Sequence, residues 1–124
     1  MRSLLATALL LIAGVAAAQE GFPLDGTWRA ERQAAGNTAV TLVLVLEWDG
    51  KKVSGILNPG PKAVTLQDVQ LIPDGWKVTL TATDAAGKPL SFEGVIGELG
   101  AYHRYMEGTW KEGGRDYKVR FVHE

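Results

Sequence analysis

The sequence contains no cysteine and only two histidines in 124 residues. The absence of cysteine excludes disulfides, thiolate zinc sites, iron–sulfur clusters and thiol nucleophiles. A small domain without such cross-links must be held together by its apolar core. Four Trp, three Tyr and three Phe are present to supply that core.

The sequence also lacks an excess of charge of either sign, since 13 Lys and Arg stand against 14 Asp and Glu. This balance gives no electrostatic reason to expect a nucleic acid or an anionic lipid as a partner. His103 and His123 lack the spaced His or carboxylate partners of a metal site. We expect both to be solvated surface side chains, and we expect neither a metal nor a cofactor.

Residues 1–18 carry the features of an export signal in the required order. A positive charge at Arg2 precedes an apolar run, and Ala16-Ala17-Ala18 supplies the small residues that a signal peptidase reads. The apolar run consists of Leu4, Leu5, Leu9, Leu10, Leu11, Ile12 and Val15. An apolar first helix or a membrane anchor is the alternative, but a span needs about 20 apolar residues.

We therefore expect cleavage between Ala18 and Gln19, which leaves residues 19–124 as one domain in the bacterial periplasm or secreted. No membrane span is expected after cleavage.

No window after residue 18 shows a sustained helical period with caps. Turn residues recur instead, and the runs between them alternate apolar and polar side chains as strands with one buried face do. Eight strands are predicted, at residues 24–33, 38–48, 51–57, 64–72, 76–83, 89–96, 102–111 and 116–122. The alternation changes phase at Gln67-Asp68, which predicts a β-bulge.

Every predicted connection is short, so successive strands should pair as neighbours. The predicted fold is all-β: an eight-stranded antiparallel up-and-down barrel, whose closure removes both exposed edges. A β-sandwich with Greek-key crossovers is the alternative, but it needs a longer connection than any visible here.

Gly26-Thr27-Trp28 opens the first predicted strand. A Gly-x-Trp at this place in an eight-stranded meander resembles the calycin superfamily, the lipocalin- and avidin-like barrels. The resemblance implies that Trp28 packs at the closed end of the barrel against an arginine of the last strand, here Arg120. The chain departs from lipocalins in lacking their C-terminal helix and disulfides, and the biotin-reading residues of avidins are not recognisable.

Alternation places most aromatic residues on the inward face, where they form either a filled core or the wall of a pocket. These residues are Trp28, Trp48, Trp76, Trp110, Phe92, Phe121 and Tyr117. Arg104 is predicted to face inward as well. Arg115 and Tyr117 form an Arg-x-Tyr pair that resembles the carboxylate clamp of fatty-acid-binding proteins. The alternative is that Arg104 reaches the rim and that Arg115 simply follows the Gly113-Gly114 turn.

We expect non-catalytic binding of a small apolar or amphipathic ligand inside the mouth of the barrel. Arg104, Arg115 and Tyr117 would anchor its polar end, and Trp28, Trp48, Trp76, Trp110 and Phe92 would form the walls. The alternative is a structural or protein-interaction module with a filled core, binding a protein near Val43 and Val45. An enzyme using Glu93, Glu107 or His103 is the least supported reading, because these side chains alternate outward.

Overall fold

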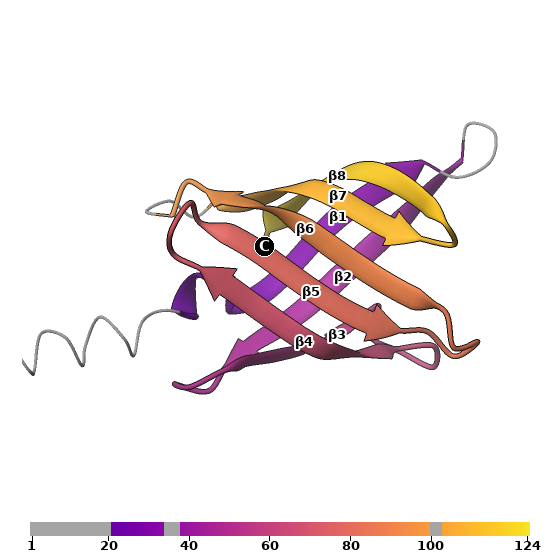
Figure 1. Ribbon diagram of the computed structural model, residues 1–124, viewed down its shortest axis with the longest axis horizontal. Helices are drawn as coiled ribbons and strands as arrows, with labels where there is room; N and C mark the ends of the chain where they lie inside the picture. The colour runs from indigo at the N-terminus through magenta and orange to yellow at the C-terminus, as the bar shows by residue number, and fades with distance from the viewer. Residues whose placement is uncertain (1–20, 34–37, 100–102) are drawn as a thin grey trace, which may run out of the picture.

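Residues 21–33, 38–99 and 103–124 are described by a computed structural model, which is a closed barrel of eight antiparallel strands in sequence order (Figure 1). The predicted up-and-down topology is confirmed. The strands are β1 (Gly26–Gln33), β2 (Ala39–Trp48), β3 (Val53–Leu57), β4 (Val64–Ile72), β5 (Lys77–Thr83), β6 (Pro89–Gly97), β7 (Tyr105–Glu112) and β8 (Arg115–His123). The expected leader and its cleavage point lie outside the described residues. Within them, no helix is long and apolar enough to cross a membrane.

The ladders of the barrel differ in length, and two of them are short. β1 closes on β8 through the pairs Trp28 with His123 and Arg29 with Val122. β3 pairs with β4 only at Ile56 with Thr65 and at Leu57 with Val64. The barrel is therefore closed, but it has two seams where neighbouring strands are joined over a short distance.

The predicted β-bulge in β4 is confirmed. Leu66 pairs with Ala82 and Asp68 pairs with Thr81, so Gln67 is the extra residue. The bulge shifts the phase of β4, because a residue added to one strand moves every later side chain to the other face. Leu66 before it and Val69 after it are consequently both buried.

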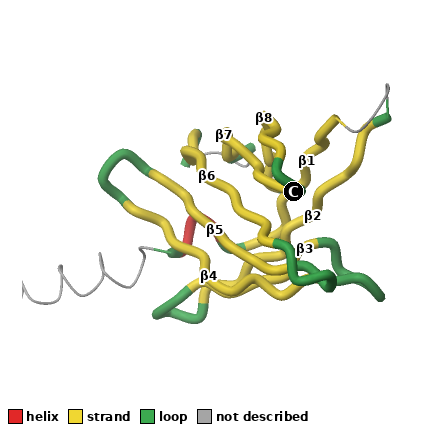
Figure 2. Tube along the Cα trace, turned by 45° about the vertical axis from the view of Figure 1, so that its right-hand side comes forward, coloured by secondary structure: helices red, strands yellow, loops and turns green. Residues whose placement is uncertain are grey.

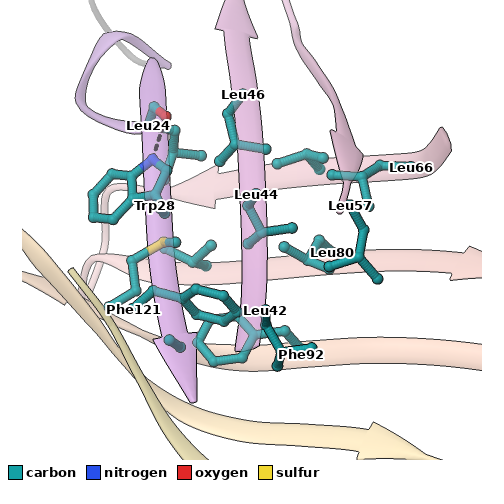
Figure 3. Packing of buried hydrophobic residues seen from close by; sticks show 14 of the residues in the cluster. Leu24, Trp28, Leu42, Leu44, Leu46, Leu57, Leu66, Leu80, Phe92 and Phe121 are labelled. Atoms are coloured by element: carbon teal, nitrogen blue, oxygen red, sulfur yellow. Dashed lines mark hydrogen bonds between the residues drawn. The ribbon is translucent and has the colours of Figure 1, made fainter. Parts of the chain in front are cut away.

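Aromatic and aliphatic side chains fill the interior of the barrel (Figure 3). Trp28, Trp110, Phe92 and Phe121 have no solvent-exposed surface. The rings of Phe92 and Phe121 meet edge to face, with their centroids 5.3 Å apart. An eight-stranded barrel is just wide enough for side chains to fill it, and this one is filled.

A 3₁₀-helical turn, η1 (Phe22–Leu24), covers the end of the barrel where β1 begins. Three successive backbone carbonyls in and beside this turn accept hydrogen bonds from the side chains of Trp28, Arg104 and His123. Trp28 Nε1 donates to Leu24 O at 2.8 Å, as drawn in Figure 3. Arg104 Nη1 donates to Pro23 O at 3.0 Å, and His123 Nε2 donates to Asp25 O at 2.9 Å. We call this end of the molecule the cap end.

Three expectations about side chains were wrong. His123 is not a frayed surface residue, because its ring is half-buried and meets the edge of Trp28 with centroids 4.8 Å apart. Arg120 does not take that place. It lies on the outer face, where it pairs with Glu107 and stacks on Tyr105.

Trp76 was expected to face inward as the first residue of a strand, yet its side chain is 41% exposed. The turn that begins at Pro73 includes Trp76, whose φ is 52°, and β5 starts only at Lys77. The first inward-facing side chain of β5 is therefore Val78, two residues after Trp76, and it is fully buried.

Candidate functional site

The two arginines expected to anchor one ligand lie at opposite ends of the barrel. Arg104 directly precedes β7 at the cap end, where its carbonyl accepts a hydrogen bond from the backbone of His123. Arg115 begins β8 at the other end, paired with Glu112, and is exposed. A single small ligand cannot reach both, so they do not form one anchoring site.

Arg104 is half-buried, and its contacts are with the cap. Its Nη1 binds the carbonyl of Pro23, while its Nε is buried and makes no hydrogen bond within the described residues. The guanidinium therefore fastens the η1 turn.

Tyr117 does lie beside an arginine, but the arginine is Arg32 of β1, stacked 4.7 Å above the ring centroid. Both nitrogens of the Arg32 fork bind the Glu112 carboxylate, Nε at 3.2 Å and Nη2 at 3.3 Å. Trp110 Nε1 donates to the same carboxylate at 2.9 Å. The carboxylate that a ligand would bring to an arginine–tyrosine clamp is supplied here by the protein itself.

Replacing Glu112 with alanine should lower the free energy of unfolding by about 2 kcal/mol. The change leaves the Arg32 guanidinium, whose side chain is 14% exposed, without its carboxylate and Trp110 Nε1 without its acceptor. Urea unfolding followed by circular dichroism measures the loss. The control is Glu107→Ala, which removes an exposed pair with Arg120 and should cost about 0.5 kcal/mol. Equal losses in the two variants would contradict this account.

The remaining expected wall residues belong mostly to the core. Trp28, Trp110 and Phe92 have no exposed surface, so they belong to the packed core and not to an open ligand wall. Trp76 is exposed in a turn. Trp48, at the end of β2, is different because it is half-buried and packs on the edge of the core.

Trp48 lines a groove of about 430 Å³ at the cap end. Toward the cap end, the last β3–β4 pair is Ile56 with Thr65. Beyond this pair the two strands run on unpaired, β3 as far as Val53 and β4, displaced by its bulge, as far as Ile72. The groove forms beside these unpaired parts. We call it the β3–β4 groove. Its lining residues are Gly21, Trp48, Lys51, Lys52, Val53, Asp68, Val69, Gln70, Leu71, Ile72 and Pro73.

Gly21 lies flat against the indole of Trp48 at one side of this groove. A Cβ atom at Gly21 would come 2.3 Å from Trp48 Cε3 and 2.9 Å from a methyl carbon of Val53. Any side chain at residue 21 would therefore displace the tryptophan. Because glycine has no side chain, residue 21 leaves room for the indole, which forms an apolar wall of the groove together with Val53 and Leu71.

Lys51 and Lys52 lie on the β2–β3 turn at the rim of the groove. The side chain of Asp49 shapes this turn, since its Oδ1 accepts the backbone N–H groups of Lys51 and Lys52, each at 2.8 Å. These two hydrogen bonds hold the pKa of Asp49 below its ordinary value, and the one from the backbone N–H of Lys52 has the larger effect. The turn therefore presents two adjacent lysines on a backbone fixed by one carboxylate.

The hydrogen bonds of Asp49 should make stability depend on pH at acid values. Because the pKa of Asp49 is lowered by folding, its contribution is complete above the ordinary value of 3.8 and is lost as pH falls through the lower folded value. In Asp49→Asn, which keeps an acceptor oxygen but cannot titrate, this part of the acid-induced loss should disappear. Urea unfolding across that range, wild type against variant, measures it. Parallel pH profiles would contradict the assignment.

The outward carboxylates offer no paired acid and base. Glu93 and Glu107 are both exposed, are not register partners, and Glu107 is paired with Arg120. His103 is exposed as expected. Over the described ranges, no group of three or more His, Asp or Glu side chains is placed to hold a metal ion.

No protein-family model matches the sequence, and no match was found among curated proteins or among solved structures. The site must therefore be judged from its own geometry. Sequence alternation pointed to Trp48 but not to Lys51, Lys52 or Leu71. The Lys51-Lys52 pair after the Asp49-Gly50 turn can be recognised in the sequence. Its position beside β4, however, depends on the pairing of strands and not on local sequence.

Proposed function

We propose that the protein is a non-catalytic binding protein whose site is the β3–β4 groove, and that its ligand is a small amphipathic molecule with an anionic group. The observation that carries the proposal is that β3 and β4 are paired at only two positions, which leaves a groove of about 430 Å³ beside Trp48. This volume lies within the range of about 300–1,000 Å³ found for small-molecule sites. The site differs from the one expected inside the barrel, whose interior is filled.

The chemistry of the groove supports an amphipathic ligand with one orientation. Trp48, Val53 and Leu71 offer apolar surface to a tail. Lys51 and Lys52 at the rim offer two ammonium groups to an anionic head, the arrangement by which charge-assisted hydrogen bonds hold carboxylates. The ligand would lie with its tail along the indole and its head at the β2–β3 turn.

Tryptophan fluorescence and calorimetric titrations with dodecanoate, below its micelle concentration, test this function. The wild type should bind, and Lys51→Ala/Lys52→Ala should bind roughly tenfold more weakly. Gln70→Trp, which places a large side chain in the groove from an exposed position, should abolish binding. The matched control Glu93→Trp, exposed on β6, should leave affinity unchanged.

The fluorescence response should also disappear in Trp48→Phe and persist in Trp76→Phe, since only the first tryptophan lines the groove. Dodecanol, which has the same tail and no charge, should bind equally to wild type and to the double lysine variant. Failure of dodecanoate to bind, or equal binding by Gln70→Trp, would contradict the proposal.

A second candidate is a structural or protein-interaction module that binds no small molecule. The filled interior favours it, because Trp28, Trp110 and Phe92, three of the expected ligand walls, are fully buried in the core. Val43 and Val45, the outer residues expected to contact a partner, are half-buried on β2. Absence of any bound small molecule after native purification, together with a negative titration, would favour this candidate.

We also propose that the chain is exported to the bacterial periplasm or secreted after cleavage of residues 1–18, and that it is calycin-like. The order of charge, apolar run and Ala16-Ala17-Ala18 supports export. The closed eight-stranded meander supports a calycin-like barrel. N-terminal sequencing of the protein from a periplasmic extract should begin at Gln19.

A further inference from the structure

β4 has an unpaired backbone edge beside the β3–β4 groove. Five consecutive residues of this strand, Asp68 to Ile72, line the groove, and each of them pairs with a residue of β5 on one side. On the other side, ladder pairing with β3 stops at Thr65, and none of the five has a partner among the described residues of β3. Although the barrel is closed, this part of β4 is therefore built like the edge strand of an open sheet.

The direction of the backbone groups decides which of them face the groove. Successive residues of a strand point their N–H and C=O groups to opposite sides. The carbonyl of Trp76 accepts the N–H of Ile96 on β6, so the N–H of Lys77 points the other way, to β4. The partner of Lys77 and every second residue before it, as far as the bulge, therefore point to β5. The N–H and C=O groups of Val69 and Leu71 point away from β5, to the side of the groove.

The opposite wall of the groove offers few free main-chain groups. It includes Gly21, beside η1, and the β2–β3 turn, and both Figure 1 and Figure 2 place η1 between that turn and the β4–β5 turn. In the β2–β3 turn the N–H groups of Lys51 and Lys52 donate to Asp49 Oδ1, and the carbonyl of Lys52 accepts the N–H of Asp49. Main-chain pairing inside the groove is therefore open on the β4 side.

An unpaired strand edge beside an apolar surface is the arrangement by which many proteins bind extended peptides. Main-chain hydrogen bonds supply affinity, and the neighbouring surface takes alternate side chains of the peptide. Trp48 and Val53 supply such a surface here. An alkyl chain alone would cover this surface but would leave the N–H and C=O groups of Val69 and Leu71 without partners, which costs free energy in a covered site.

We propose that the ligand of the β3–β4 groove is a short extended peptide, whose main chain pairs with Val69 and Leu71 as a strand added to β4. This inference rests on the proposed function and names its class of ligand, and the anionic group of the ligand is then the C-terminal carboxylate of the peptide. At about 3.3 Å per residue, the edge from Asp68 to Ile72 is matched by a peptide of roughly five residues.

The place of the edge favours a single extended chain over a second copy of the barrel. The edge lies inside a groove, with Gly21 and the β2–β3 turn on its other side. The edge strand of a second barrel would bring its own neighbouring strand and turns against that wall, whereas a peptide has none. The inference draws on main-chain pairing and not on charge, since Asp68 lines the same groove as Lys51 and Lys52.

Calorimetric titration of the protein with the pentapeptide acetyl-Val-Thr-Val-Thr-Val tests the inference, together with five versions that each carry one N-methylated amide. The unmodified peptide should bind. Because only alternate N–H groups of an added strand face β4, N-methylation at every second residue should lower affinity at least about tenfold, and methylation at the intervening residues should change it less than about twofold. Gln70→Trp should abolish binding, and Glu93→Trp should not.

Amide hydrogen exchange measured by NMR locates the added strand on the protein. With saturating pentapeptide, the N–H groups of Val69 and Leu71 should exchange at least about tenfold more slowly than in the free protein. The matched control is Glu31, which lies two residues beyond the last β1–β8 pair, at the other short seam of the barrel. Its exchange rate should be unchanged by the peptide. Equal protection of Glu31 and of the two β4 residues would contradict pairing with β4.

Dodecanoate separates failure of this inference from failure of the proposed function. If dodecanoate binds and the pentapeptide does not, the peptide class is overturned and the amphipathic-ligand function stands. If neither binds, both are overturned. Equal losses of affinity for all five N-methylated peptides would overturn pairing with β4. Self-association of the protein, abolished by Gln70→Trp, would overturn the inference in favour of a second copy of the chain.

Discussion

Replacing Gly108 with alanine should lower the free energy of unfolding by about 3 kcal/mol. A Cβ atom at Gly108 would lie 2.0 Å from the carbonyl oxygen of Glu93 and 2.4 Å from Cα of Gly94, its partner on β6. Both are backbone atoms of a strand paired on either side, so neither can move without breaking a ladder. Urea unfolding followed by circular dichroism measures the effect.

The control for this prediction is Gly87→Ala in the β5–β6 turn. No atom lies within 4 Å of a Cβ at Gly87, and only its φ of 79° opposes the change. We expect a loss of about 1 kcal/mol there, from the left-handed conformation alone. If the two alanine variants were equally stable, the close approach of β6 and β7 at Gly108 would be ruled out.

Replacing Trp28 with alanine should cost about 3–5 kcal/mol, which is enough to unfold a marginally stable small domain. The indole is fully buried, donates to Leu24 O and packs against His123. Its removal leaves a large cavity and an unpaired carbonyl under the cap. Thermal and urea unfolding of the domain give the loss directly.

Trp76→Ala is the matched control, since it removes the same side chain from an exposed turn. We expect a change within about 0.5 kcal/mol, as for most surface substitutions. A loss at Trp76 as large as that at Trp28 would mean that Trp76 faces the core, as alternation alone had predicted. Trp28→Phe should lie between the two alanine variants, because it keeps most of the packing and loses the hydrogen bond.

Much of the fold was predictable because alternation and turn residues are local signals. The strands β2, β4 and β6 begin and end within about a residue of their predicted bounds. The bulge at Gln67 was visible as a change of phase. Short connections then left the meander as the simplest topology. Local patterns thus sufficed for the elements and for their order.

Local patterns failed where a side chain's surroundings depend on distant segments. His123 looked like a frayed end, but β8 carries it to the carbonyl of Asp25, near the start of the described chain. Trp76 continued an apolar alternation, but the backbone of a turn overrides that pattern. In both cases, a contact or dihedral angle that the sequence does not state decided the outcome.

The candidate site was only partly predictable for the same reason. Trp48 was identified by its inward position at the end of a strand. The β3–β4 groove depends on where pairing between two strands stops, which follows from the bulge and from the length of β3. The Arg32–Glu112 pair joins β1 to β7, residues that no spacing rule connects.

The hydrogen bonds that hold the η1 turn constrain the order in which the barrel can fold. Two of the donors that hold the carbonyls of this segment are synthesised long after it: Arg104 follows Pro23 by 81 residues, and His123 follows Asp25 by 98 residues. The pairing of Trp28 with His123 adds the same requirement. A nascent chain halted before β8 thus retains an open sheet with an exposed first edge, a form prone to aggregation. Closure of the barrel must therefore await the synthesis of β8, the strand that pairs with β1.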